Sequence, residues 1–164
     1  IPKGLVGSEM CIRDSLPSVL DYLSINLENT NQIVAGASMG GLMSMKTSIL
    51  FPQFKNIISL SPAFWFGYPS VLNDVKNLSN ESSTYLYTGK KEGHIFGDHV
   101  KNIFPNNWDL DFSNNDDFYY SGVKNIKDSF DSNNKKVIFS FQDNGRHNET
   151  SWATAILEIL GKLI

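Results

Sequence analysis

Apolar residues recur along this chain in two patterns, at helical spacing and in short continuous runs. Leu16, Val19, Leu20, Leu23 and Leu27 follow the helical spacing and would form one apolar stripe on a helix. Elsewhere, apolar runs of strand length are separated by segments of helix length. This alternation predicts a mostly parallel sheet with right-handed crossovers, and therefore an α/β fold.

The predicted strands and helices alternate through most of the chain. Strands are expected at 32–37, 56–60, 84–88 and 136–141, and helices at 16–27, 39–51, 69–78, 122–130 and 152–163. In sheets of this class the chemistry collects at the carboxyl ends of the strands. The residues that directly follow each strand are therefore the candidates for a functional site.

The run from Leu5 to Ser15 resembles the translation of a transposase sequencing adapter, residue for residue. We interpret residues 1–15 as a non-native segment and leave them out of the fold prediction. Cys11, the only cysteine, lies in this segment, so cysteine usage indicates nothing about the redox compartment. We expect the native protein to begin upstream of Leu16, which leaves its localisation open between cytoplasm and periplasm or secretion.

Residues 16–164 are enough for one domain. The formal net charge of the chain is −3, and the charges within residues 1–15 cancel. A mildly acidic chain gives no electrostatic reason to expect nucleic acid or an anionic membrane as a partner. No apolar run is long enough to span a membrane.

A turn rich in small residues, Gly36-Ala37-Ser38-Met39-Gly40-Gly41, follows the first predicted strand and precedes a helix. This G-x-S-x-G pattern is typical of a nucleophile elbow, in which small residues allow a sharp turn and the Ser stands clear of the sheet. A glycine-rich turn without catalytic function is the alternative, since the bare pattern is common. Ser38 is the candidate nucleophile, and the Met39 backbone N–H is a candidate oxyanion donor.

A carboxylate and a histidine follow later strands in the order Ser, acid, His that α/β-hydrolases use. Glu92 lies in the turn after the third predicted strand, and His147 follows the fourth. Asp143 lies four residues before His147 and is the alternative acid. A loose group of His94, Asp98 and His99 could bind a metal, although a solvated loop is favoured because zinc sites present tighter ligand sets.

These motifs, together with 61–65 and the run His147-Asn148-Glu149 before Trp152, resemble the esterase D-like "putative esterase" family of α/β-hydrolases. The likeness falls on the branch that contains enterobactin-type siderophore esterases and extends over nearly all of 16–164. It implies that residues 16–164 form a partial α/β-hydrolase domain. It implies ester hydrolysis through an acyl-enzyme, with Ser38 as nucleophile, His147 as general base and Glu92 as acid. It also implies a small-molecule ester substrate and no cofactor or metal. A second oxyanion donor would come from a loop between earlier strands, outside this chain.

Two other functions fit the same fold: a catalytically silent binding domain and an acyltransferase of the same family. Trp65 and Trp152 are candidate substrate contacts, with packing as the alternative. Asn148 and Glu149 could simply begin the last helix.

The segment 94–121 carries many aromatic residues without a clear period, and we expect a lid-like insertion that affects substrate preference, or else a mobile polar insert. The strand 32–37 would be an exposed edge if earlier strands are missing. We therefore expect low solubility and weak activity of the chain as it stands.

Overall fold

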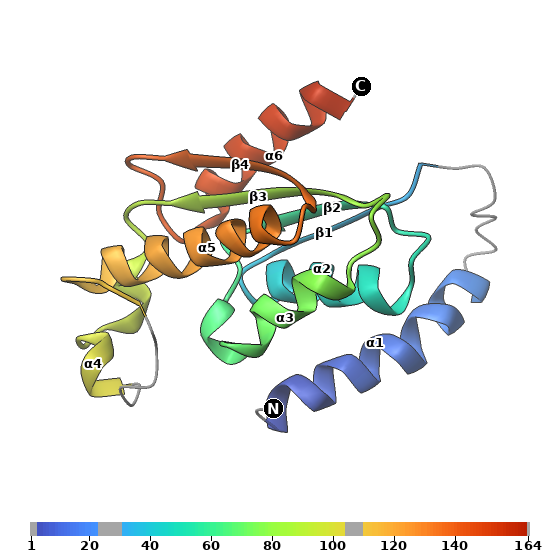
Figure 1. Cartoon of the computed structure of the whole chain (residues 1–164), viewed down its shortest axis with the longest axis horizontal. Helices are drawn as coiled ribbons and strands as arrows, with labels where there is room; N and C mark the ends of the chain where they lie inside the picture. The colour runs from blue at the N-terminus through green and yellow to red at the C-terminus, as the bar shows by residue number, and fades with distance from the viewer. Residues whose placement is uncertain (1–2, 23–30, 104–109, 164) are drawn as a thin grey trace.

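The computed structural model describes residues 3–22, 31–103 and 110–163. Four parallel strands form one sheet in the order β1-β2-β3-β4, and consecutive strands are neighbours. The strands are β1 (Ile33–Ala37), β2 (Asn56–Leu60), β3 (Ser83–Gly89) and β4 (Lys136–Gln142). Helical segments connect them, as Figure 1 shows. The predicted α/β class is confirmed.

Helices cover both faces of this sheet. The helices α2 (Met39–Leu50), α3 (Ser70–Asn77) and α5 (Asn115–Ser132) lie on one face, and α6 (Glu149–Leu163) lies on the other (Figure 1).

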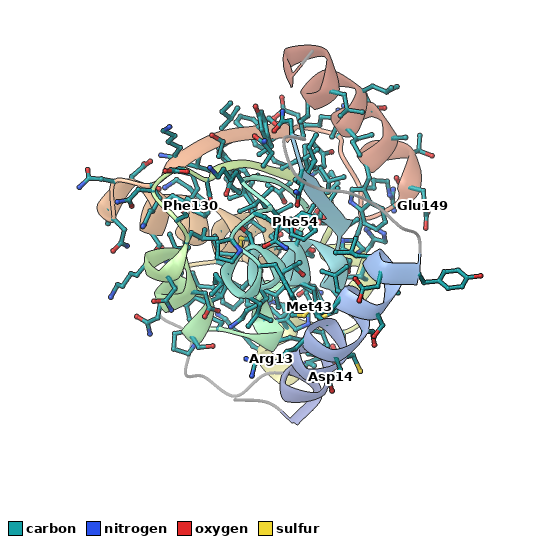
Figure 2. The ribbon with its side chains drawn as sticks, turned by 90° about the vertical axis from the view of Figure 1, so that its right-hand side faces the viewer. Arg13, Asp14, Met43, Phe54, Phe130 and Glu149 are labelled. Carbon is teal, nitrogen blue, oxygen red and sulfur yellow. The ribbon has the colours of Figure 1, made fainter. Side chains whose placement is uncertain are left out.

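Strand β2 shows why two cores result. Its side chains alternate, so that Ile57 packs into the core under α2, α3 and α5, whereas Ile58 packs into the core under α6. In Figure 2, the labelled Met43 and Phe130 lie among the packed side chains of the core between the sheet and the helices α2, α3 and α5.

The first helix, α1 (Lys3–Tyr22), differs from the prediction of a helix at 16–27. It begins well before Leu16 and contains the adapter-like residues, while 23–27 lie outside the described residues. Ile12 packs against the core on the α2 side of the sheet. That contact places the middle of α1 against the core, which the sequence alone did not indicate.

The predicted strands and the helices α2 and α3 agree with the structure to within one residue at each end, whereas two more helices, besides α1, begin earlier than predicted. Helix α5 begins at Asn115 rather than at Gly122. Helix α6 begins at Glu149 rather than at Trp152, and Asn148 Oδ1 accepts a hydrogen bond of 3.0 Å from the Ser151 N–H. Asn148 and Glu149 therefore do begin the last helix.

The segment 94–121 is partly core. It includes the end of η2 (Gly93–Phe96), α4 (Val100–Ile103) and the first turns of α5. The other short 3₁₀ helix, η1 (Phe64–Phe66), lies between β2 and α3. Phe118 and Tyr119 are buried, which contradicts an overhanging insertion for this part of the segment. Phe104 and Trp108 lie outside the described residues, so the lid function remains a prediction.

None of the helices in the described part of the chain is both long enough and apolar enough to span a membrane.

Candidate active site

The residues that follow the four strands meet at the carboxyl edge of the sheet. Ser38 directly follows β1, Ser61 directly follows β2, and Glu92 lies in the turn after β3. His147 lies in the connection from β4 to α6. Parallel strands bring their carboxyl ends to one edge, so residues that are far apart in the sequence become neighbours there.

Ser38 sits on a strained turn between β1 and α2. Its φ of 55° and ψ of −121° are unusual for a residue with a side chain. A Cβ on Gly36 would collide with the Gly40 carbonyl oxygen, and one on Gly41 would lie 2.7 Å from the Leu60 carbonyl oxygen. The close approach of the backbone therefore requires glycine at positions 36 and 41, whereas a Cβ on Gly40 would meet no atom within 4 Å among the described residues.

The imidazole of His147 lies between the Ser38 hydroxyl and the Glu92 carboxyl group. Nε2 of His147 is 2.9 Å from Ser38 Oγ, and Nδ1 is 2.8 Å from Glu92 Oε2. The ring also contacts Trp152 edge-to-face, with centroids 4.9 Å apart, and Tyr119, with centroids 5.4 Å apart. The two hydrogen bonds and two ring contacts fix the orientation of the imidazole.

Glu92 is fully buried, with a relative exposure of 0%. Its Oε1 accepts a hydrogen bond of 2.6 Å from the Ser61 hydroxyl and another from the Gly89 backbone N–H. Its Oε2 faces His147. Each oxygen therefore faces a hydrogen-bond donor, as a buried carboxylate requires.

Two buried phenols respond to the charge of Glu92. Burial, together with the nearby charge of Glu92, raises the pKa of Tyr119 well above its usual value. Burial also raises the pKa of Tyr87 to about 12, with the charge of Glu92 as the second cause. The Tyr119 hydroxyl donates a hydrogen bond of 2.6 Å to the Ser61 carbonyl oxygen.

Asp143, the alternative acid, does not contact His147. Its carboxylate forms an ion pair of 2.8 Å with Lys90, and its side chain is 77% exposed. The hydrogen bond that the Lys90 ammonium donates to Asp143 raises the pKa of Lys90. The structure therefore brings Glu92, and not Asp143, to the imidazole.

The Met39 backbone N–H belongs to the first residue of α2, directly after Ser38. N–H groups in the first turn of a helix lack partners within the helix, and the positive end of the helix dipole favours an anion there. The predicted oxyanion role of Met39 therefore remains compatible with its position, and it remains a prediction.

The two tryptophans differ in their surroundings. Trp65 is half-buried and packs edge-to-face on Phe96 and Tyr119, with ring centroids 5.0 Å and 5.2 Å apart. Trp152 donates a hydrogen bond of 3.0 Å from Nε1 to the Ser61 hydroxyl oxygen. Trp152 therefore supports the buried hydrogen-bond network around Glu92. The substrate contacts predicted for Trp65 and Trp152 remain predictions.

The candidate metal ligands do not gather into a site. His94 Nδ1 lies 3.0 Å from the Lys91 carbonyl oxygen, and Asp98 accepts a hydrogen bond from the His99 backbone N–H. That bond lowers the pKa of Asp98. Within residues 3–22, 31–103 and 110–163, no group of three His, Cys, Asp or Glu side chains could hold a metal ion.

Ser61 and Tyr119 were not predicted as site residues. Ser61 directly follows β2, a position where functional residues are expected, but no sequence motif gives it a role. Tyr119 lies in the segment expected to be an insertion. A signal for either residue would have required knowledge of the three-dimensional contacts.

Comparison with known proteins gives one family and several similar folds. The model of the family described as "Putative esterase" matches residues 9–163. The enterobactin esterase FES from Shigella flexneri, solved in the presence of enterobactin, has a TM-score of 0.59 and 17% identity, covering 90% of this chain and 34% of that one. The same protein with 2,3-di-hydroxy-N-benzoyl-glycine has a TM-score of 0.59 and 16% identity, covering 93% of this chain and 38% of that one.

The chain thus spans little more than a third of the length of these structures. Their sequence identity to it is low, so the likeness shows the fold. No curated protein matched the chain.

Proposed function

This chain belongs to the family described as "Putative esterase", and on that premise we propose that it hydrolyses carboxylic esters through a serine nucleophile. Ser38 is the nucleophile, His147 the general base and Glu92 the acid that orients His147. The observation that carries the proposal is the unbroken hydrogen-bond chain from Ser38 Oγ through both nitrogens of His147 to Glu92. A hydroxyl, an imidazole and a buried carboxylate in this order are the parts that acyl transfer needs.

In the first half of the reaction, Ser38 Oγ attacks the carbonyl carbon of the ester while its proton moves to His147 Nε2. The electron pair of the carbonyl moves onto oxygen, and the Met39 N–H donates to this oxyanion. The carbonyl then re-forms, the bond to the alcohol oxygen breaks, and His147 gives its proton to the leaving alcohol. An acyl group remains on Ser38.

In the second half, a water attacks the acyl carbon and transfers a proton to His147. The second oxyanion collapses, the bond from the acyl carbon to Ser38 Oγ breaks, and His147 returns the proton to Ser38. Throughout both halves Glu92 remains a carboxylate and stabilises the imidazolium that forms twice. The products are a carboxylic acid and an alcohol.

The proposed substrate class is small-molecule carboxylic esters. The similar structures are named as enterobactin esterases, so the test panel includes enterobactin beside simple p-nitrophenyl esters. At 17% identity the likeness does not transfer that substrate to this chain.

The proposal is tested with a fluorophosphonate probe, which reacts with activated serines. We expect mass spectrometry to find the label on Ser38, and we expect labelling to disappear in Ser38→Ala and in His147→Ala. Ser48→Ala is the matched control, because Ser48 is a buried serine whose hydroxyl donates to the Phe54 carbonyl oxygen at the far end of α2. A folded chain that takes no label, or takes it on another residue, would contradict a serine esterase and favour a binding domain.

A second measurement separates hydrolysis from acyl transfer. If the acyl-enzyme reacts with water, addition of a primary alcohol leaves the free acid as the main product. A transesterified product as the main species would indicate an acyltransferase instead.

A further inference from the structure

We propose that Ser61 is a positioning residue that fixes both the place and the charge of Glu92. The inference rests on the proposed function and goes beyond it, because no sequence motif assigns Ser61 a role. Ser61 Oγ lies 2.6 Å from Glu92 Oε1, and both residues have a relative exposure of 0%. A hydrogen bond to a charged group in a site without solvent is among the stronger ones that a protein makes.

The direction of this hydrogen bond follows from Trp152. Its indole N–H can only donate, and it lies 3.0 Å from Ser61 Oγ. The hydroxyl oxygen of Ser61 therefore accepts from Trp152, and its single proton is directed at Glu92. The chain of hydrogen bonds has one direction, from the indole to the carboxylate.

The same direction determines the state of the carboxyl group. Oε1 of Glu92 faces the Ser61 hydroxyl and the Gly89 N–H, and Oε2 faces His147 Nδ1. A proton on either oxygen would compete with one of these donors, so the network favours the carboxylate. Nδ1 of His147 must then carry a proton, which leaves Nε2 unprotonated and able to accept the Ser38 hydroxyl proton.

The backbone of Ser61 adopts a conformation that is unfavourable for a residue with a side chain. Its φ of 43° lies in the left-handed region, where glycine is the usual residue. Its N–H donates to the Tyr87 carbonyl oxygen over 2.7 Å, and its own carbonyl oxygen accepts from the Tyr119 hydroxyl over 2.6 Å. A residue kept at positive φ by contacts with two other elements, with its side chain aimed at the acid, fits a functional constraint better than a packing one.

The rate of fluorophosphonate labelling at Ser38 tests the role of Ser61. Ser61→Gly removes the hydroxyl and suits the positive φ, whereas Ser61→Ala removes the hydroxyl and keeps the backbone strain. We expect both variants to label about 10-fold to 100-fold more slowly at saturating probe, because one hydrogen bond to a charged group is lost. The probe concentration for half-maximal rate should stay unchanged, since Ser61 does not touch the probe. Ser48→Ala should retain the full rate.

A spectroscopic readout distinguishes positioning from a general loss of stability. The Nδ1 proton of His147, shared with Glu92, should give a far-downfield proton resonance that disappears in His147→Ala. We expect this resonance to shift or broaden in Ser61→Gly and in Trp152→Phe, and to stay unchanged in Ser48→Ala. Trp152→Phe leaves an aromatic ring at this position and removes the indole donor together with part of the ring volume, so it tests the donor to Ser61 without changing Ser61 itself.

The outcomes separate this inference from the proposed function. An unlabelled Ser38 in the unsubstituted chain overturns the serine esterase and with it the role of Ser61. A labelled Ser38 together with an unchanged rate and an unchanged resonance in Ser61→Gly overturns the role of Ser61 alone. Slower labelling in Ser61→Gly with a shifted resonance supports it, even if Ser61→Ala fails to fold.

Discussion

Burial distinguishes the two carboxylates that the sequence offered to His147. Glu92 is withdrawn from solvent among a hydroxyl, a backbone N–H and the imidazole. Asp143 lies in solvent and is paired with Lys90. A carboxylate that orients an imidazole acts most strongly where water cannot screen it, so the buried residue is the one that fits the role.

Exchange of each carboxylate for its amide tests this difference. Donors face both oxygens of the Glu92 carboxyl group, so Glu92→Gln places an amide NH₂ where only acceptors fit. If that NH₂ faces His147, Nδ1 of His147 must accept, and the imidazole then carries its proton on Nε2, where it cannot take the Ser38 proton. We expect labelling of Ser38 to slow by about 100-fold or more. Asp143→Asn removes only an exposed ion pair, and its rate should stay within about twofold of the unsubstituted chain. Equal losses in the two variants would contradict the assignment of the acid.

The buried phenols near Glu92 lead to a prediction about alkaline pH. Tyr87 and Tyr119 have raised pKa values in the folded chain, that of Tyr87 about 12. As the pH rises above about 10, these tyrosines lose protons in the unfolded chain but keep them in the folded one. The unfolded state then binds fewer protons, so the free energy of unfolding falls with pH.

This fall should be visible in urea unfolding curves measured at a series of pH values from neutral to alkaline. Tyr87→Phe removes one of the titrating groups, so its stability should fall less steeply between about pH 10 and pH 12. Identical slopes for the variant and the unsubstituted chain would show that Tyr87 titrates normally in the folded state.

At the scale of single residues, the sequence predicted the three side chains that meet at the site and missed those that support them. Ser38, Glu92 and His147 each lie in a short motif at the end of a strand. The contact between Ser61 and Glu92 spans 31 positions, and that between Tyr119 and Ser61 spans 58. No local pattern encodes contacts of that range, which only the assembled sheet creates.

At the scale of elements, strands were predicted more accurately than helix starts. Helix α5 shows why: Asn114 caps it by accepting from the Asp117 N–H, and two acidic residues occupy its first turn. Phe118 and Tyr119 then continue the buried stripe of the helix. These start signals were present in the sequence, but the surrounding aromatic and polar residues hid the helical spacing.

The turn between β1 and α2 allows a matched test of backbone packing. A methyl group on Gly36 would collide with the Gly40 carbonyl oxygen, whereas one on Gly40 would meet no atom within 4 Å among the described residues. We expect Gly36→Ala to lower the free energy of unfolding by about 2 kcal/mol or more. Gly40→Ala lies in α2 and should be neutral or slightly stabilising, because alanine favours helices.

Urea unfolding of the two glycine variants measures this difference in stability. The rate of fluorophosphonate labelling at Ser38 then shows whether the turn still holds Ser38 in place. A Gly36→Ala chain as stable as Gly40→Ala would show that the turn can relax, and that the elbow is less constrained than its geometry indicates.

At the scale of the whole molecule, the sheet has both faces covered but differs at its two edges. Within the described ranges, β1 pairs only with β2, and β4 pairs only with β3. Strand β4 begins with Lys136, whereas β1 reads Ile-Val-Ala-Gly-Ala and carries no charge. Charged residues on an edge strand oppose pairing with another chain, so β1 is the less protected edge.

We therefore expect the chain to self-associate through β1, and a charge there should reduce the association. Ile33 is 37% exposed on β1, and Ile138 is 46% exposed on β4, so lysine at either position adds a charge to one edge without opening the core. Sedimentation velocity over a range of concentrations should show less association for Ile33→Lys than for the unsubstituted chain, and little change for Ile138→Lys. Equal effects of the two lysines would mean that net charge, and not the β1 edge, governs association. A monomer at every concentration would contradict self-association through β1.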